Sequence, residues 1–333
     1  MPVFSLSDKV TFIESVFGRY ELARDGLNIA VRCPIPTCDS RKDKGKKKFA
    51  IRTTDDACHC WVCGFRARSL VPLLRRFASQ EVFTDYCTRF LDRKHVMYDA
   101  QGNAGNEHTD IYLPHGFMLL TEAPKNDRDA IDLKTYLSNE RGLGEGDGWR
   151  YGLGYVPKDA TEDYRWRRRV IMPSFDAGGK LNYYTGRAID VRRRPKYDNP
   201  SVDRTSIVFN ELNVDWTRRL VLCEGPFDMV NCGDNVLPLL GSELNEEYAV
   251  FERLLVHSTP VAMSLDADVW ATKTLKIAKK LVGYGLDVVI VDTRSFTDPG
   301  NATRKQFAEA LALAKPYDWT AAMMTKLGAA TAR

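Results

Sequence analysis

Three short apolar runs in the second half of the chain have the length and composition of buried β-strands: residues 219–223, 261–265 and 286–291. Acidic residues follow all three runs: Glu224, then Asp266 and Asp268, then Asp298. A helical pattern over residues 270–284 lies between the last two runs, and this alternation favours an open α/β sheet. Ligands of such sheets bind at the carboxyl ends of the strands, where carboxylates suit Mg²⁺. The pattern predicts a metal-dependent phosphoryl-transfer centre.

Each of these features also has a simpler explanation. A strand ending in Glu-Gly is often only a strand and a turn, and Asp-x-Asp is common in surface loops. Three strand-to-acid transitions in order, with a helix between two of them, are harder to attribute to chance.

Earlier parts of the chain alternate between helical and strand patterns. Apolar residues at helical spacing predict helices after Ser7, over residues 66–93 and over residues 133–143. A turn at Gly178 and Gly179 predicts a β-hairpin of residues 169–175 and 181–185. Residues 98–107 are rich in Gly and Asn, which indicates a flexible linker.

Five of the eight cysteines crowd into one short segment, which in a reducing compartment indicates metal more often than disulfides. The segment is too short and polar to fold on an apolar core alone. We predict a structural zinc ribbon held by two cysteine pairs: Cys33, Cys38, Cys60 and Cys63. The first pair is widely spaced, so Cys58 and His59 remain alternative ligands.

A basic loop between the two cysteine pairs ends in Lys46, Lys47 and Lys48. A charge run is usually only a solvated loop, and Trp61 and Phe65 nearby are also explained by packing within the ribbon. On a zinc ribbon, however, such a loop is well placed to neutralise phosphates, and the aromatic rings to stack on unpaired bases. We therefore interpret the zinc module as a reader of single-stranded template.

Length and composition agree with a protein of several domains. A chain of 333 residues fits two or three domains, and 44% hydrophobic residues indicate a globular protein. The net charge of +4 is modest, so nucleic-acid binding must be argued from where the charges lie. No apolar run is long enough to cross a bilayer and the N-terminus lacks a signal pattern, so we expect a cytoplasmic protein without a membrane partner. No GxxxxGK[ST] sequence occurs, so we expect any helicase to be a separate protein.

The strand-to-acid transitions resemble the TOPRIM domain of DnaG-type primases, topoisomerases and some nucleases. Other motifs narrow the resemblance to the DnaG-type primases of bacteria and bacteriophages. These motifs follow the ribbon in order: Tyr136-Leu137 with Arg141-Gly142-Leu143, Leu153-Gly154-Tyr155, Arg169 to Pro173, Gly186-Arg187, Lys196-Tyr197-Asp198-Asn199, Glu224-Gly225 with Asp228, Asp266-Ala267-Asp268, and Asp298-Pro299. Topoisomerases and TOPRIM nucleases share the acids but not the ribbon or the basic region.

The resemblance implies a multidomain α/β and α+β fold: a zinc-binding ribbon domain over residues 1–78, a helical or flexible linker over 79–110, a basic α+β subdomain of the polymerase core over 111–215, a TOPRIM α/β catalytic subdomain over 216–316 and a C-terminal tail over 317–333. It also implies template-directed synthesis of short RNA primers by two-metal nucleotidyl transfer. Asp266, Asp268 and Asp298 would be the main ligands of Mg²⁺ or Mn²⁺. Glu224 would be a further ligand or would orient a metal-bound water, and Asp228 would support them.

In this interpretation Arg169, Arg187 and Lys196 hold the triphosphate and the template backbone, because guanidinium and ammonium groups match phosphate oxygens. For Arg165 and Arg192, salt bridges to the protein's own acids are an equal alternative. The implied partners are a single-stranded DNA template, ribonucleoside triphosphates, a separate replicative helicase and a DNA polymerase at the replication fork of a bacterial cell.

Two positions depart from the family pattern. Gly300 stands where a second acid is frequent, so that Asp292 is an alternative metal ligand, and Asn210 stands where a lysine is common. The departures keep one rival open, a catalytically weakened primase-like protein that binds single-stranded DNA and recruits partners. A TOPRIM nuclease, which would cleave with the same metals, is the second rival.

Overall fold

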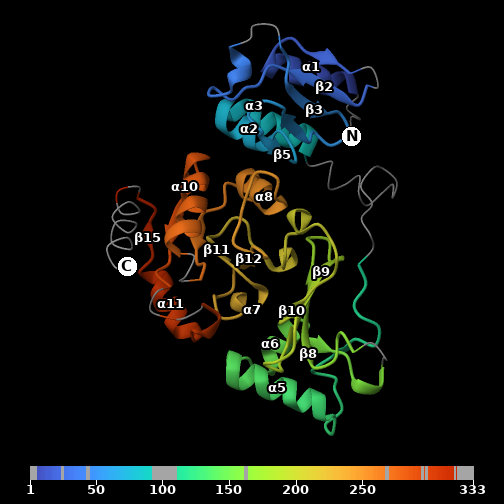
Figure 1. Ribbon diagram of the computed structural model, residues 1–333. Helices are drawn as coiled ribbons and strands as arrows, with labels where there is room; N and C mark the ends of the chain where they lie inside the picture. The colour runs from blue at the N-terminus through green and yellow to red at the C-terminus, as the bar shows by residue number, and fades with distance from the viewer. Residues whose placement is uncertain are drawn as a thin grey trace. The chain divides into compact units, whose positions relative to one another are not determined.

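The computed structural model describes residues 6–23, 26–42, 46–91, 111–160, 164–266, 270–293, 296, 299–318 and 320. The chain divides into two compact units, the first formed by residues 1–107 and 244–258, the second by residues 108–243 and 259–333 (Figure 1). The predicted linker over residues 98–107 and most of the predicted C-terminal tail lie outside the described residues. The predicted domain boundaries stay predictions.

The first unit is built on a five-stranded antiparallel sheet in the order β1-β2-β3-β4-β5. Its strands alternate between buried and more exposed residues, as a sheet with one covered face requires. Aromatic rings of the helices pack together, with Phe12 5.7 Å from Tyr86 and 5.3 Å from Phe90 between ring centroids. The elements are β1 (Glu21–Leu22), β2 (Asn28–Val31), β3 (Phe49–Arg52), β4 (Cys58–Cys60), β5 (Arg66–Ala67), α1 (Leu6–Phe17), η1 (Asp39–Arg41), α2 (Val71–Phe77), α3 (Gln80–Tyr86), η2 (Cys87–Leu91) and α8 (Ala249–His257).

The second unit contains an antiparallel sheet in the order β10-β9-β8-β7-β6. The predicted hairpin is confirmed, because β8 and β9 pair over nearly their whole length. The helix predicted over residues 133–143 is also confirmed, although it begins five residues earlier. It ends at Arg141 and is capped by Gly142, whose φ of 64° is the left-handed conformation that glycine adopts readily. The elements are β6 (Met118–Leu119), α5 (Arg128–Arg141), α6 (Glu145–Arg150), β7 (Gly154–Tyr155), η3 (Lys158–Ala160), β8 (Arg169–Phe175), β9 (Leu181–Ala188), β10 (Tyr197–Asp198), η4 (Arg204–Ser206) and η5 (Glu211–Asn213).

A mostly parallel sheet, in the order β12-β11-β13-β14-β15, completes the second unit. β12, β11, β13 and β14 run parallel and β15 is antiparallel. The three predicted strands are β11, β13 and β14, so the predicted α/β sheet is confirmed. The elements are β11 (Leu220–Cys223), α7 (Pro226–Met229), β12 (Val236–Pro238), β13 (Val261–Met263), η6 (Trp270–Thr274), α10 (Leu275–Gly283), β14 (Val288–Ile290), η7 (Pro299–Asn301), α11 (Arg304–Ala312) and β15 (Lys315–Pro316).

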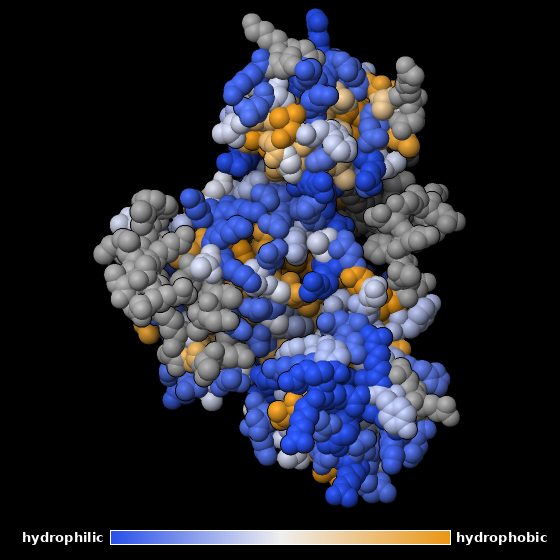
Figure 2. Space-filling view, in the orientation of Figure 1, coloured by the Kyte–Doolittle hydropathy of each residue, from blue (hydrophilic) through white to orange (hydrophobic). Residues whose placement is uncertain are grey.

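Both sheets of the second unit contribute to one hydrophobic core. Val170 and Met172 of β8 belong to the same buried cluster as Val221 of β11 and Ala262 of β13. The basic antiparallel sheet and the parallel sheet are therefore packed together. On the face drawn in Figure 2, hydrophobic residues lie in small groups among hydrophilic ones. In the described part of the chain, no helix is both long and apolar enough to cross a membrane.

Candidate functional site

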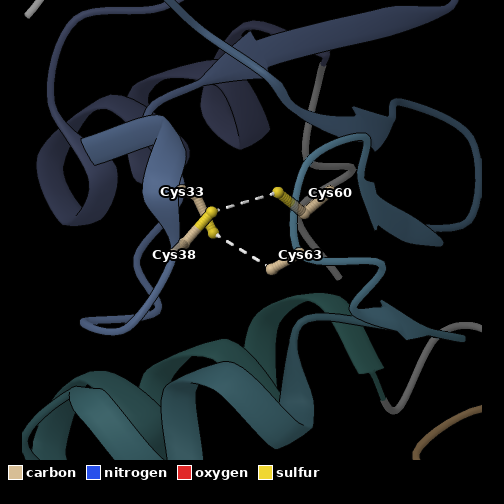
Figure 3. A group of neighbouring side chains, drawn as sticks. All are labelled: Cys33, Cys38, Cys60 and Cys63. Atoms are coloured by element: carbon tan, nitrogen blue, oxygen red, sulfur yellow. Dashed lines mark hydrogen bonds between the residues drawn. The ribbon is translucent and has the colours of Figure 1, made fainter. Parts of the chain in front are cut away.

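The four predicted zinc ligands lie together in the first unit, with all their sulfur atoms within 4.8 Å of one another (Figure 3). The Cys33 and Cys63 Sγ atoms are 3.9 Å apart, and those of Cys38 and Cys60 are 3.7 Å apart. A tetrahedral zinc ion with Zn–S bonds of about 2.3 Å requires S–S separations of roughly 3.8 Å. The donor set and its spacing therefore fit a structural zinc ion.

Local structure explains why these cysteines meet. Cys33 follows β2 and Cys60 ends β4, and both strands pair with β3. Behind the second pair, Gly64 has a φ of 73° and donates its N–H to the Cys60 carbonyl at 3.0 Å, which closes the turn around Cys63. Burial raises the pKa of the Cys33 and Cys63 thiols, and a bound cation would offset that cost of ionisation.

The alternative ligands lie elsewhere. The Cys58 thiol donates to the Ser69 carbonyl at 3.6 Å, and His59 projects from the opposite face of β4, edge-on to Trp61 with 4.4 Å between ring centroids. The prediction that Cys33, Cys38, Cys60 and Cys63 come together is confirmed.

The outer face of this zinc ribbon is basic and aromatic. The strand register places His59 opposite both Ala50 and Arg66, and Ala50 opposite Ala30, so small residues form the centre of the face. Trp61 is 72% exposed beside them. Three exposed cations surround this centre and have no ion-pair partner among the described residues: Arg32, Lys48 and Arg66. We call these three cations with Trp61 the ribbon face.

The predicted basic loop contributes less than expected. Lys47 pairs with Glu21 at 2.8 Å, and only 18% of its side chain is exposed, so this ion pair already engages the ammonium group that was predicted to bind phosphate. Lys46 is exposed. Phe65 packs 6.4 Å from Phe49 between ring centroids, which favours the packing explanation for this ring. Residues 43–45 of the loop lie outside the described residues.

Sequence reasoning missed two of the three cations. Arg32 follows β2 and Arg66 begins β5, two strands that β3 and β4 separate in the sheet, and both arginines lie outside the lysine run in the sequence. The available signal was the alternation of buried and exposed residues along each strand, which places Arg32, Lys48 and Arg66 on one face once the register is known.

In the second unit, Glu224 and Asp266 follow adjacent parallel strands. Leu222 of β11 pairs with Met263 of β13, and the two parallel strands therefore end at the same edge of the sheet. Burial raises the pKa of the Cys223 thiol, and the nearby charges of Asp228 and Asp266 raise it further. Asp266 therefore lies close to the end of β11, where Glu224 follows. We call this the acid edge.

Neighbouring loops are tied to the acid edge. Thr293, after β14, donates its hydroxyl to the Leu265 carbonyl at 2.9 Å. Asp292 precedes this threonine, so the alternative metal ligand also follows a strand of the same sheet. Asp268 and Asp298 lie outside the described residues. Among the residues that the structure describes, only the four cysteines form a group that could hold a metal.

Asp228 holds the turn that carries Glu224. Its carboxylate accepts the Gly225 N–H at 2.9 Å and caps the short helix α7. A Cβ at Gly225 would lie 3.0 Å from Asp228 Oδ2, so a side chain there would displace this carboxylate. Asp228 is thus positioned to support the turn after Glu224, while its role in catalysis stays a prediction.

Arg169 does not lie where a phosphate can reach it. The side chain is 1% exposed. Its guanidinium donates to four backbone carbonyls: Arg165, Gly186, Pro195 and Lys196, at 2.8 to 3.2 Å. Burial lowers its pKa. The prediction that Arg169 binds triphosphate is therefore wrong, and it instead holds together the loop that carries Lys196.

Arg187 lies in an aromatic environment beside α7. It is 7% exposed and donates to the hydroxyls of Tyr136 and Tyr197. Its guanidinium also lies 5.7 Å from the centre of the Phe227 ring, two residues beyond Gly225. Burial raises the pKa of Tyr197 to about 12, although the charge of Arg187 opposes this. Arg187 has no carboxylate partner among the described residues, and its phosphate role stays a prediction.

The other basic residues divide between ion pairs and exposure. Arg165 pairs with both carboxylate oxygens of Asp198, at 2.5 and 2.9 Å, which favours the salt-bridge alternative. Arg192 and Lys196 are exposed. Arg168 contacts three carboxylates, those of Asp129, Asp132 and Asp190. Hydrogen bonds to these carboxylates raise the pKa of Arg168, and the bond to Asp190 has the largest effect.

The two departures from the family pattern occupy structural positions. Asn210 is buried with a φ of 62° and donates its side-chain amide to the Val236 carbonyl at 3.3 Å. The Gly300 carbonyl accepts a hydrogen bond of 3.0 Å from Asn231.

Comparisons with known proteins agree with the motifs. No protein-family model matches the chain. A curated DNA primase of Staphylococcus aureus (strain COL) is 22% identical over 349 residues, covering 88% of this chain and 56% of the relative. A DNA primase of Thermotoga maritima is 21% identical over 342 residues, covering 90% of this chain and 58% of the relative. The chain thus spans little more than half the length of these curated relatives.

Solved structures of primases are also similar to the chain. The E. coli primase catalytic core has a TM-score of 0.48 and 20% identity, covering 60% of this chain and 78% of that one. The zinc-binding and RNA polymerase domains of Aquifex aeolicus primase have a TM-score of 0.44 and 17% identity, covering 94% and 84%. The predicted resemblance to DnaG-type primases is confirmed by the sequence relatives: over nearly nine tenths of its length, this chain is similar to bacterial DNA primases.

Proposed function

We propose that this chain is a template-directed RNA polymerase of the primase type, which makes short RNA primers on single-stranded DNA. The observation that carries the proposal is the acid edge: Glu224 and Asp266 follow the adjacent parallel strands β11 and β13. The sheet that contains these strands shares one hydrophobic core with the basic antiparallel sheet. The sequence relatives named DNA primase support the proposal. We further propose that the parallel sheet is a TOPRIM domain.

In the proposed reaction, the 3′-oxygen of one ribonucleotide forms a bond to the α-phosphorus of the next. The bond from that phosphorus to the bridging oxygen breaks, pyrophosphate leaves, and the hydroxyl proton passes to solvent. Glu224 and Asp266 would hold a divalent cation together with Asp268 and Asp298, while Asp228 keeps the Glu224 turn in place. Bound Mg²⁺ or Mn²⁺ would stabilise charge on the attacking and leaving oxygens.

Positive groups would hold the substrates. Lys196 is exposed on the loop that Arg169 organises, and Arg187 lies beside α7, so both are proposed to contact phosphates. On the ribbon face, a single strand would place phosphates against Arg32, Lys48 and Arg66 and stack a base on Trp61. This pairing of cations with an exposed ring suits unpaired nucleic acid.

Further parts of the proposal concern the surroundings of the protein. We propose ribonucleoside triphosphates as substrates, and a separate helicase and a DNA polymerase as partners at a bacterial or bacteriophage replication fork in the cytoplasm.

The test is synthesis by purified protein on single-stranded DNA with labelled ribonucleotides and Mg²⁺. We expect short RNA from the unchanged protein and from Glu309→Gln, which alters an exposed acid of α11, and none from Asp266→Asn. Equal product from Asp266→Asn would contradict the assignment. Cleavage of the template would identify a nuclease, and binding without synthesis or cleavage would identify a recruitment protein.

A further inference from the structure

The loop after β12 is anchored beside Glu224. The Leu239 N–H donates to the Cys223 carbonyl at 2.9 Å, and the Gly241 N–H donates to the Glu224 carbonyl at 3.2 Å. From the basic sheet's side, Arg204 donates to the Leu240 carbonyl at 3.1 Å. The loop is therefore fixed to the acid edge on both sides.

The backbone of this loop has an unusual shape. Leu240 has a φ of 57° and Gly241 a φ of 146°, both in the region that glycine enters most readily. A leucine there is held by its surroundings, and the three hydrogen bonds of the loop provide this restraint. Ser242, the next residue, is consequently presented from a fixed backbone next to Glu224.

A lysine reaches this serine from the other side of the edge. Lys273 lies in η6, which follows Asp266 along the chain, and its ammonium donates to the Ser242 hydroxyl oxygen. Lys273 is exposed and forms no ion pair with any carboxylate in the described part of the chain. The positively charged ammonium group of Lys273 is therefore hydrogen-bonded to a neutral hydroxyl of the loop next to Glu224.

The direction of this hydrogen bond leaves donors for a ligand. The ammonium group has three protons and uses one on Ser242. The serine hydroxyl accepts that bond with its oxygen, so its own proton remains available. Two ammonium protons and one hydroxyl proton, at a loop whose backbone is hydrogen-bonded to that of Glu224, match the oxygens of a phosphate.

We propose that Lys273 and Ser242 bind the β- and γ-phosphates of the incoming ribonucleoside triphosphate, the group that leaves as pyrophosphate. This rests on the proposed function and adds the site of the leaving group. A solvated contact between a lysine and a serine would need neither the anchored loop nor the position at the carboxyl ends of the strands, where ligands of α/β sheets bind.

The test compares two variants with the same change of charge. Lys273→Met removes the proposed contact, whereas Lys279→Met removes an exposed lysine farther along the same helical segment, in α10. The probe is pyrophosphate with Mg²⁺, measured by calorimetry, alongside kcat and KM for ribonucleotides on a single-stranded template. Thermal unfolding verifies that each variant folds.

Loss of a charged hydrogen bond predicts an affinity for pyrophosphate about tenfold or more lower in Lys273→Met, with KM rising more than kcat falls. Lys273→Arg should retain most of the affinity, and Ser242→Ala should lose a smaller part. Equal behaviour of Lys273→Met and Lys279→Met would overturn the inference. If the protein binds pyrophosphate through Lys273 but makes no RNA, the polymerase proposal fails and the phosphate site is still supported.

Discussion

The ribbon face predicts how binding of single-stranded DNA depends on salt. Replacing Arg32, Lys48 and Arg66 together by glutamine removes three exposed cations that lack ion-pair partners among the described residues. Each phosphate neutralised on a single strand contributes about −0.7 to the slope of log affinity against log salt, so the slope should become about 2 less negative. Between 50 and 200 mM salt, the unchanged protein should therefore lose about 20-fold more affinity than the triple variant.

The assay is fluorescence anisotropy of a labelled oligothymidine titrated at several salt concentrations. Lys47→Gln is the matched control, because Lys47 is already paired with Glu21 and should leave the slope nearly unchanged. Trp61→Ala should weaken binding by about 1–3 kcal/mol at every salt concentration, because stacking depends little on salt. A triple variant with the slope of the unchanged protein would refute the assignment of this face.

Three further predictions concern metal and stability. Elemental analysis should find one zinc ion per molecule of the purified protein. Cys60→Ser should lose both the zinc and the fold of the ribbon, because zinc binding in such modules is coupled to folding. Folded, unchanged protein that contains no zinc would contradict the site. Arg168→Met should destabilise the protein to urea by about 1–3 kcal/mol, because three carboxylates lose their shared donor, whereas Arg192→Met should change it by less than about 0.5 kcal/mol. Folding raises the pKa of Tyr197 to about 12, so the neutral phenol contributes its full stabilisation below about pH 10 and loses it as the pH rises from about 10 to about 12. The free energy of unfolding of Tyr197→Phe should therefore fall less steeply than that of the unchanged protein over this pH range. Equal pH dependence of the two proteins would refute this prediction.

The metal ligands and strand ends were accessible to sequence reasoning because they rest on local patterns. Cysteine spacing identified the four thiols that meet in the ribbon. Apolar runs followed by acids identified β11 and β13, since a buried parallel strand is apolar throughout and its end is marked by the first polar residue.

What the sequence could not supply is burial and register. Arg169 and Arg187 belong to equally basic motifs, yet Arg169 donates its hydrogen bonds to backbone carbonyls of strand β9 and of two loop segments. Arg32 and Arg66 join Lys48 only through the pairing of strands, which one sequence does not specify. Strand β12 was not predicted from the sequence, although it carries the loop with Ser242.

The central claim is that the acid edge binds divalent cations, and Mn²⁺ binding followed by electron paramagnetic resonance tests it most directly. We predict that the unchanged protein and Glu309→Gln bind Mn²⁺ alike, that Mg²⁺ displaces it, and that Asp266→Asn and Glu224→Gln each weaken it about tenfold or more, as loss of a charged ligand does. Mn²⁺ binding with equal affinity by all four proteins would contradict the account.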